Sequence, residues 1–459
     1  MTETAQFLIN GRACHLSADD GDESLLRWLK RQQLHGTKEG CADGDCGACT
    51  VVVRLPDAEG QPQWQAVNSC LLPIGSLVGR EVLTVEALAA DQSLHPVQQT
   101  MAEGGGSQCG YCTPGFVMSL FAAHSTGQLD EACFEGNLCR CTGYLPIRRA
   151  LQCLQDQPPQ SPEAATTRLD EASGELPRWS VPTSLSAALD AKQADPAALW
   201  FAGGTDLGVV LSHGRSTPQR YIVLDRIAEL QQISIEEYQV RIGAGVSLRA
   251  IEQGLAGIFP SIDQMLPWFA ARQVRNRATL GGNLGTASPI GDLLPVLLAL
   301  DASVHCRSVE GARELPIEQF FLAYRKTALQ PNELIEAVTV PRRKDWLSAS
   351  YKVAKRQTDD ISIVAAAFAL KLDAEGQVSE ARLAFGGVAA TPLRARRAES
   401  ALLGRRLDQS TMEAVAQILR QEFSPLSDLR AGAEYRRALC GNLFAKFVRE
   451  QVAASEVAA

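Results

Sequence analysis

The most informative segment of the chain reads Gly40-Cys41-Ala42-Asp43-Gly44-Asp45-Cys46-Gly47-Ala48-Cys49. Its cysteines have the C-x4-C-x2-C spacing of plant-type [2Fe-2S] sites, and Cys70 supplies a fourth thiol after a predicted strand. A loop that folds over such a cluster must point its thiolates inward and its amide N–H groups at the sulfur atoms, and the glycines permit the backbone angles required. Cys41, Cys46, Cys49 and Cys70 are therefore predicted cluster ligands. A structural zinc site is the alternative, although zinc sites usually join paired C-x2-C units through a longer spacer.

A second group of cysteines follows as one C-x2-C pair, Cys109 and Cys112, and one C-x-C pair, Cys139 and Cys141. A turn or helix-start signal follows each pair. Two helix N-termini that converge on one site would bring positive partial charge and free N–H groups toward an anionic thiolate cluster. Taken alone, these four thiols suit zinc or one of several iron-sulfur clusters. Their position directly after a plant-type site favours a second [2Fe-2S] cluster.

Composition restricts the class of protein. The chain has 459 residues, a formal net charge of -8 and 13 cysteines, ten of them within the first 141 residues. A negative surface disfavours nucleic acid, and no apolar run is long enough to span a membrane. The N-terminus lacks a basic or twin-arginine signal, so we expect a cytoplasmic protein whose thiols stay free for metals. The five cysteines outside the two groups are predicted to be small buried residues, namely Cys14, Cys133, Cys153, Cys306 and Cys440.

Hydrophobic periodicity divides the chain into five parts. Residues 1–82 are predicted to hold strands over 7–14 and 50–54 with a helix over 23–31, and residues 83–156 to be helical over 97–103, 115–124 and 147–155. A proline-rich linker over 157–178 precedes an α/β domain over 179–345, with strands at 221–224 and 240–242 and a helix at 292–300. Residues 346–459 are predicted to add an α+β subdomain, with strands over 363–370 and 381–385 and helices over 412–422 and 435–450.

Two glycine-rich segments follow the linker. Residues 200–207 (WFAGGTDL) end a predicted strand in a tight turn whose amide groups can approach a diphosphate, although an ordinary turn explains the same residues. Residues 268–283 combine Arg272, Arg275 and Arg277 with Gly281-Gly282, which suits a phosphate site or else a solvated helix face followed by a turn. Gly243-Ala244-Gly245 lacks the third glycine of a Rossmann fingerprint, so a dinucleotide would be held in another way.

Together these motifs resemble the molybdenum hydroxylase (xanthine oxidase) family over nearly the whole chain, and all eight cysteine positions match its cluster ligands. The resemblance implies an α+β multidomain fold: a ferredoxin-like β-grasp [2Fe-2S] domain, an all-α helical-bundle [2Fe-2S] domain, and a vanillyl-alcohol-oxidase-like, non-Rossmann FAD domain with an α+β C-terminal subdomain. It assigns the FAD diphosphate to Trp200, Phe201, Ala202, Gly203, Gly204, Thr205, Asp206, Leu207, Thr279, Leu280, Gly281, Gly282 and Asn283. It assigns flavin stacking to Phe269, adenine-side or ribose hydroxyls to Asp292, and further flavin contacts to Ile335 and Lys352.

The same resemblance implies a function. The fused clusters and flavin resemble the small subunit of the bacterial two-subunit xanthine dehydrogenases, with no catalytic residue beyond the flavin site. Electrons from hydroxylation of hypoxanthine or xanthine to urate would leave a molybdopterin-binding large subunit through two [2Fe-2S] clusters and FAD to NAD. A heterotetramer with two copies of each subunit is expected. The same role for another heterocycle or an aldehyde is an alternative, as is oxygen in place of NAD, and a zinc-binding scaffold without redox function is a further one.

Overall fold

The computed structural model describes residues 5–89, 93–160, 176–214, 219–356 and 358–458, and side chains as far as Gln451. The chain forms two compact units. Unit 1 comprises Met1–Glu229, Ser247–Ala250 and Ala271–Thr279, and unit 2 comprises Leu230–Val246, Ile251–Ala270 and Leu280–Ala459. The predicted linker over 157–178 lies mostly outside the described residues.

Unit 1 begins with a five-stranded mixed sheet of order β2-β1-β5-β3-β4. Its strands are β1 (Gln6–Ile9), β2 (Arg12–His15), β3 (Thr50–Pro56), β4 (Pro62–Asn68) and β5 (Glu81–Leu83), and helix α1 (Leu25–Arg31) packs its buried face on them. Residues 7–14 are a hairpin and not the single strand that was predicted, because Asn10 and Gly11 have positive φ angles and form a tight turn. The α+β character predicted for this segment is confirmed.

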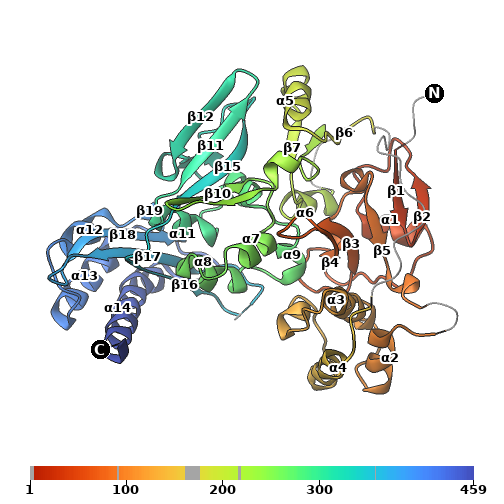
Figure 1. The fold of residues 1–459 in the computed structure, drawn as a ribbon, viewed down its shortest axis with the longest axis horizontal. Coiled ribbons are helices and arrows are strands. Elements are labelled where there is room, and N and C mark those ends of the chain that lie inside the picture. The colour runs from red at the N-terminus through yellow and green to blue at the C-terminus, as the bar shows by residue number, and fades with distance from the viewer. Residues whose placement is uncertain (1–4, 90–92, 161–175, 215–218, 357, 459) are drawn as a thin grey trace. The chain divides into compact units, whose positions relative to one another are not determined.

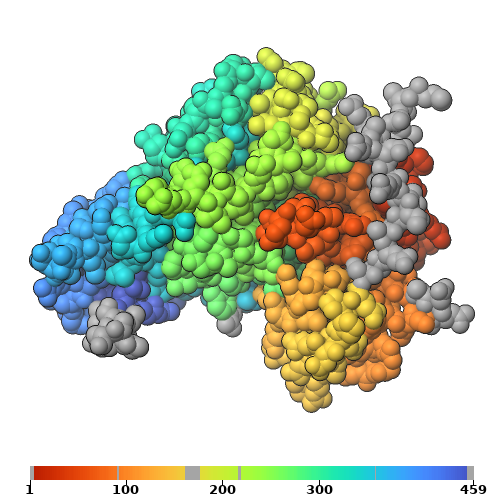
Figure 2. Space-filling model, viewed as in Figure 1, coloured from red at the N-terminus to blue at the C-terminus, as the bar shows by residue number. Residues whose placement is uncertain are grey.

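A helical segment follows the sheet. It contains α2 (Pro96–Glu103), α3 (Thr113–Thr126) and α4 (Leu145–Gln155), and each includes the corresponding predicted helix. Helix α3 is buried along most of its length because it packs between β3 and β4 on one side and α2 and α4 on the other. Figure 1 shows the three helices gathered beside β3 and β4, and the space-filling view shows them as a compact orange-to-gold lobe against the red first domain (Figure 2).

The rest of unit 1 centres on a three-stranded parallel sheet of order β6-β8-β7. The strands are β6 (Trp179–Ser180), β7 (Leu199–Phe201) and β8 (Tyr221–Val223), accompanied by α5 (Leu185–Ala194), α6 (Leu207–Ser212) and α9 (Arg272–Arg275). Trp179 stacks on Tyr221 with ring centroids 4.4 Å apart and extends the first domain's core. The core therefore runs without interruption from the first sheet into this second one.

Unit 2 contains two antiparallel sheets (Figure 1). The first, of order β12-β11-β15-β10-β9, contains β9 (Ile233–Ile235), β10 (Gln239–Gly243), β11 (Ser303–Ser308), β12 (Gly311–Pro316) and β15 (Leu334–Pro341). The second, of order β16-β17-β18-β19, contains β16 (Trp346–Val353), β17 (Val364–Leu372), β18 (Val378–Gly386) and β19 (Leu393–Arg394). A two-stranded ribbon pairs β13 (Phe321–Ala323) with β14 (Lys326–Thr327).

The helices of unit 2 are α8 (Pro260–Met265), α10 (Leu280–Thr286), α11 (Leu293–Ala299), α12 (Arg396–Leu402), α13 (Gln409–Glu422) and α14 (Ala433–Ala458), while α7 (Leu248–Gly254) runs from unit 1 into unit 2. Helices α12, α13 and α14 pack with β17 and β18 around a core that contains five buried phenylalanines, namely Phe368, Phe385, Phe423, Phe444 and Phe447. These helices and strands match the α+β subdomain predicted at the C-terminal end.

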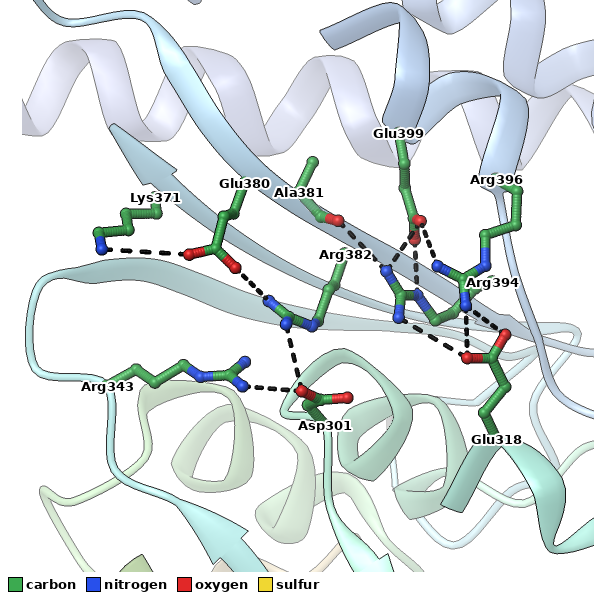
Figure 3. A network of polar contacts seen from close by, with 10 residues as sticks. All are labelled: Asp301, Glu318, Arg343, Lys371, Glu380, Ala381, Arg382, Arg394, Arg396 and Glu399. Carbon is green, nitrogen blue, oxygen red and sulfur yellow. Dashed lines mark hydrogen bonds and ion pairs between the residues drawn. The ribbon is translucent and has the colours of Figure 1, made fainter. Parts of the chain in front are cut away.

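An ionic network joins several strands, helices and loops of unit 2 (Figure 3). Arg394 makes two hydrogen bonds of 2.8 Å to the Glu399 carboxylate, whose side chain is 8% exposed. The neighbouring Arg396 reaches the same carboxylate but is itself 55% exposed. On the other side of the network, Asp301 accepts hydrogen bonds from Arg343 and Arg382. Because a bidentate contact to a buried carboxylate is stronger than an exposed pair, Arg394 is the main stabilising partner of Glu399.

The multidomain α+β architecture predicted from the sequence is confirmed. Among the described residues, no helix is long and apolar enough to cross a membrane.

Candidate iron-sulfur and flavin sites

The first four cysteines come together in unit 1 as two pairs. Cys41 and Cys46 exchange backbone N–H to sulfur contacts of 3.2 and 3.3 Å, and the sulfur atoms of Cys49 and Cys70 lie 3.4 Å apart. The amide of Asp43 also donates to the Cys41 sulfur, at 3.3 Å. The loop thus directs N–H groups at its sulfur atoms, as its glycine content predicted. Two pairs of thiolates are what a two-iron cluster needs, because each iron takes two cysteine ligands.

Two glycines of this loop have backbone conformations that favour glycine. Gly44 and Gly47 have φ angles of 90° and 64°. Gly40 has no such angle, but a Cβ there would lie 2.6 Å from the Cys46 sulfur. All three glycines are therefore required locally, two for conformation and one for space.

The second four cysteines also form two pairs, Cys112 with Cys139 and Cys109 with Cys141. Cys112 is the residue that precedes helix α3, and Cys141 lies shortly before α4, so both pairs sit at helix N-termini. Cys109 and Cys141 are exposed, whereas Cys49 and Cys70 of the first site are buried. The eight predicted ligands thus form two sets of four: the first has two buried and two half-buried thiols, and the second has two half-buried and two exposed thiols.

Hydrogen bonding lowers the pKa of one thiol of a pair, toward the thiolate that binds metal, and raises the pKa of its partner, as for Cys41 and Cys46. The neighbouring Cys46 thiol lowers the pKa of Cys41 to about 5. Burial acts to raise the pKa of Cys139, but hydrogen bonds from the Thr142 hydroxyl and amide outweigh it and lower that pKa. The donor set and its amide contacts fit iron-sulfur clusters in both places.

The predicted diphosphate turn lies between β7 and α6 in unit 1. Phe201 is fully buried, so its side chain belongs to the core and only its backbone can face a ligand. Gly204 has a φ angle of 79°, and a Cβ at Gly203 would lie 1.7 Å from the carbonyl oxygen of Arg277. This close approach requires glycine at position 203, which an ordinary solvent-exposed turn would not.

Helix α6, which follows this turn, contacts the first cysteine loop. A Cβ at Gly208 would lie 2.1 Å from the carbonyl oxygen of Leu71, the residue after Cys70. The Ser212 hydroxyl donates to the Ala42 carbonyl at 3.1 Å, and His213 pairs with Asp43 at 2.8 Å. The predicted diphosphate segment is therefore adjacent to the loop that carries the first cysteine set.

Arg272, Arg275 and Arg277 do not lie on a solvated helix face, which was one of the two interpretations of the sequence. All three are buried, and they form ion pairs of 2.9, 2.7 and 3.0 Å with Asp130, Glu135 and Asp225, respectively. Burial acts to raise the pKa of Asp225, but the adjacent Arg80 and Arg277 guanidiniums outweigh it and hold that pKa low. These arginines anchor α9 to the rest of unit 1 and are committed to internal partners.

The remaining predicted flavin residues belong mostly to unit 2. Lys352 donates to the Asp292 carboxylate and to the Trp268 carbonyl, both at 2.8 Å. Trp268 directly precedes Phe269 in the sequence. Ser362, which was not predicted, also donates to Asp292. Burial raises the pKa of Asp292, and Lys352 opposes that rise. Ile335 lies buried in β15.

The second glycine-rich segment of the flavin prediction begins helix α10. A Cβ at Gly281 would lie 2.7 Å from the Ala244 Cβ, so the backbone approaches closely there too. The buried Oδ1 of Asn283 has no hydrogen-bond partner among the described residues. A buried acceptor without a donor fits a bound cofactor that presents a hydroxyl group there, since a diphosphate itself has only acceptors.

Of the five other cysteines, Cys133, Cys306 and Cys440 are buried as predicted. Cys14 is half-buried, and the prediction is wrong for Cys153, which is exposed near the end of the amphipathic helix α4.

Four family models match successive parts of the chain. Residues 7–74 match the 2Fe-2S iron-sulfur cluster binding domain and residues 84–152 the [2Fe-2S] binding domain. Residues 172–343 match the FAD binding domain in molybdopterin dehydrogenase, and residues 349–451 the CO dehydrogenase flavoprotein C-terminal domain.

Curated relatives match almost the whole chain. A xanthine dehydrogenase of Emericella nidulans is 33% identical over 98% of this chain, and one of Drosophila subobscura is 33% identical over 97%. The chain spans only 38% and 39% of the length of these two relatives.

Solved structures of the same kind are also similar. Matches with a TM-score of 0.55 include the carbon monoxide dehydrogenase of Hydrogenophaga pseudoflava, at 29% identity, and the quinoline 2-oxidoreductase of Pseudomonas putida 86, at 26%. They cover 58% and 59% of this chain and 94% of the matched chain. The two thiol sets, the predicted diphosphate turn and these similarities lead to one conclusion: the chain belongs to the molybdenum hydroxylase family and carries its two iron-sulfur domains and its flavoprotein domains.

Proposed function

We propose that this chain is the electron-transfer subunit of a xanthine dehydrogenase. In this proposal, electrons from hydroxylation of hypoxanthine or xanthine to urate pass from a molybdopterin centre on a partner subunit, through two [2Fe-2S] clusters and FAD, to NAD. The ligands of the clusters are Cys41, Cys46, Cys49 and Cys70 for the first and Cys109, Cys112, Cys139 and Cys141 for the second. A cytoplasmic location stays a prediction.

The observation that carries the proposal is the arrangement of the two thiol sets within unit 1. The first set is largely enclosed, and its loop contacts helix α6 directly after the predicted diphosphate turn. The second set has two exposed thiols, Cys109 and Cys141, and is accompanied by exposed apolar side chains, namely Tyr111, Leu138 and Leu145. An exposed apolar surface on a helical lobe suits a docked protein. We therefore assign the second set to the side of the molybdenum-containing partner and the first set to the side of FAD.

The proposed FAD contacts follow the same logic. The glycines at positions 203, 204, 281 and 282 let backbone N–H groups approach a diphosphate, and Phe269 supplies an aromatic face for the flavin ring. Lys352 neutralises the buried Asp292 carboxylate and thereby holds it ready to accept hydrogen bonds from ligand hydroxyls. When bound, FAD supplies the exchange between single-electron and hydride chemistry that delivery of electrons to NAD requires.

The choice of a purine substrate is supported by how the domains are joined. The xanthine dehydrogenase relatives match 97–98% of this chain within one polypeptide, so they share its fusion of iron-sulfur and flavin domains. The carbon monoxide dehydrogenase and quinoline oxidoreductase chains match only 58–59% of it. The same electron-transfer role for another heterocycle is the second candidate, and the quinoline enzyme is the observation that favours it. We propose a heterotetramer with two copies of each subunit.

The test uses purified chain reconstituted with iron, sulfide and FAD. It should oxidise NADH with an artificial dye as electron acceptor and show no activity on xanthine. The Phe269→Ala variant should lose most of this activity, whereas Cys112→Ser should retain most of it, because NADH reduces FAD without using the clusters. Dye reduction at the full rate in protein stripped of FAD would refute the proposed electron order.

The partner is tested by purification from the native cell. The chain should be recovered in a large molybdenum-containing complex that oxidises hypoxanthine and xanthine. Recovery of that complex with activity only on another heterocycle would establish the second candidate instead.

A further inference from the structure

The loops that carry the two thiol sets are in direct contact through their backbones. The amide of Leu138 donates to the carbonyl oxygen of Cys46 at 3.0 Å. Cys46 is a proposed ligand of the first cluster, and Leu138 directly precedes Cys139, a proposed ligand of the second. A single hydrogen bond therefore connects Cys46, a ligand of the first set, to Leu138, the residue next to Cys139 of the second set. The Tyr111 hydroxyl makes a second link, because it donates to the Glu39 carbonyl at 2.5 Å.

Glycine is required on both sides of this contact. A Cβ at Gly47 would lie 2.2 Å from the carbonyl oxygen of Gly136, and a Cβ at Gly115 would lie 2.3 Å from the carbonyl oxygen of Gly47. Both distances are far below any normal contact with a backbone atom. The loops therefore approach more closely than any side chain at these positions would permit, and each of the three glycines is within three residues of a proposed ligand.

The side chain of Asn137 lies at the centre of the contact and is 2% exposed. Its Nδ2 donates to the Gly47 carbonyl at 2.9 Å and to the Thr50 hydroxyl at 3.2 Å. Its Oδ1 accepts from the Ser119 hydroxyl at 2.6 Å and from Gln273 Nε2 at 2.8 Å. Both donors and both acceptor sites of the carboxamide are thus used. This one side chain joins the first cysteine loop to helix α3 and to α9.

A buried carboxamide with all its hydrogen bonds made rigidifies its surroundings, whereas one lost partner leaves a buried group unpaired. Ser119 strengthens the network because it also accepts from Gln273 Nε2, at 3.1 Å. The position of Leu138 relative to Cys46 is therefore set by Asn137, its immediate neighbour in the sequence.

We propose that Asn137 is a positioning residue for electron exchange between the two clusters. Its carboxamide holds the hydrogen bond from the Leu138 amide to the Cys46 carbonyl, which fixes the separation and orientation of the two ligand loops. The exchange itself moves one electron, so that one cluster is oxidised and the other reduced by one electron, and it needs no proton, atom or further reactant. The inference rests on the proposed function, because it assumes that both thiol sets hold clusters.

The test compares three variants of the reconstituted chain. Asn137→Asp keeps the size and the acceptors but removes the donor to the Gly47 carbonyl, and Ser119→Ala removes one restraint more gently. Asn276→Asp is the matched control, because Asn276 is also buried and donates through Nδ2 to a backbone carbonyl, that of Ala66, away from the ligand loops. The readouts are iron content, the magnetic splitting between the two reduced clusters in electron paramagnetic resonance, and hydrogen exchange of the peptide that contains Leu138.

Wild-type protein should contain four irons and show the splitting. In Asn137→Asp the splitting should weaken or vanish while both single-cluster signals remain, and exchange at the Leu138 amide should rise about tenfold, the effect of one lost buried hydrogen bond. Ser119→Ala should show a smaller change of the same kind and decides the matter if Asn137→Asp does not fold. Unchanged splitting in folded variants with four irons, or an equal loss in Asn276→Asp, would overturn the inference. Fewer than four irons in wild-type protein would instead refute the proposed function.

Discussion

Replacement of Gly203 by alanine should weaken FAD binding, because no room exists for a methyl group. The new Cβ would lie 1.7 Å from the carbonyl oxygen of Arg277, and ordinary contact begins at 3.4 Å, so the two backbone segments must separate by about 1.7 Å. Overpacking of this kind costs ~1–3 kcal/mol. The movement also breaks the hydrogen bond from Arg277 Nε to the Gly203 carbonyl, worth about 1 kcal/mol. Where they fall on the flavin-bound form, these costs total ~2–4 kcal/mol, and their lower end already reduces FAD affinity about 30-fold.

The assay is the ratio of flavin to protein after gel filtration, together with iron content and the thermal unfolding curve. Gly203→Ala should lose flavin and keep its iron. Gly432→Ala is the control, because nothing lies within 4 Å of its Cβ position and its φ angle is not left-handed. This control should retain FAD and unfold as wild type does. Stoichiometric FAD at unchanged affinity in Gly203→Ala would refute the proposed role of the turn.

Three further predictions concern charges that stabilise the two units. Asp225→Asn should lower the free energy of unfolding of unit 1 by ~3–5 kcal/mol in denaturant titrations, because it leaves buried guanidiniums without their carboxylate. Lys352→Met should lower the free energy of unfolding of unit 2 most at neutral pH, because it leaves the buried Asp292 carboxylate charged and without its cation. Burial already raises the pKa of Asp292, and loss of Lys352 raises it further. At acid pH Asp292 becomes protonated, so the loss of stability relative to wild type should shrink. In the network of Figure 3, Arg394→Met should cost ~1.5–3 kcal/mol and Arg396→Met less than about 1 kcal/mol, measured as the difference in unfolding free energy.

Local spacing predicted the parts of the structure that depend on local sequence. The cysteine spacings identified both thiol sets, and the periodicity identified α2, α3 and α4, because a ligand loop and an amphipathic helix are each encoded within one short segment. The hairpin of β1 and β2 was interpreted as one strand, although the adjacent Asn10 and Gly11 are a known turn signal.

Contacts between distant segments were not predictable in this way. Asn137 lies 90 residues from Gly47 and 136 from Gln273. Nothing in the local sequence indicates that its carboxamide hydrogen-bonds to both. The partners of Arg272, Arg275 and Arg277 are likewise remote, so the sequence left a solvated face and a phosphate site as equal interpretations. The Asn immediately before the Leu-Cys-Arg-Cys segment was the one signal available, since a polar residue beside a ligand loop often holds that loop in place.

The central claim is that two separate [2Fe-2S] clusters are bound by the two thiol sets, and its most direct test is electron paramagnetic resonance of the reduced Cys46→Ser variant with a parallel iron assay. Wild-type protein should contain four irons and give two distinct signals. The variant should contain two irons, lose one signal and retain the other together with its FAD. Loss of both signals from a protein that is still folded, or zinc in place of iron in the wild-type chain, would contradict the account.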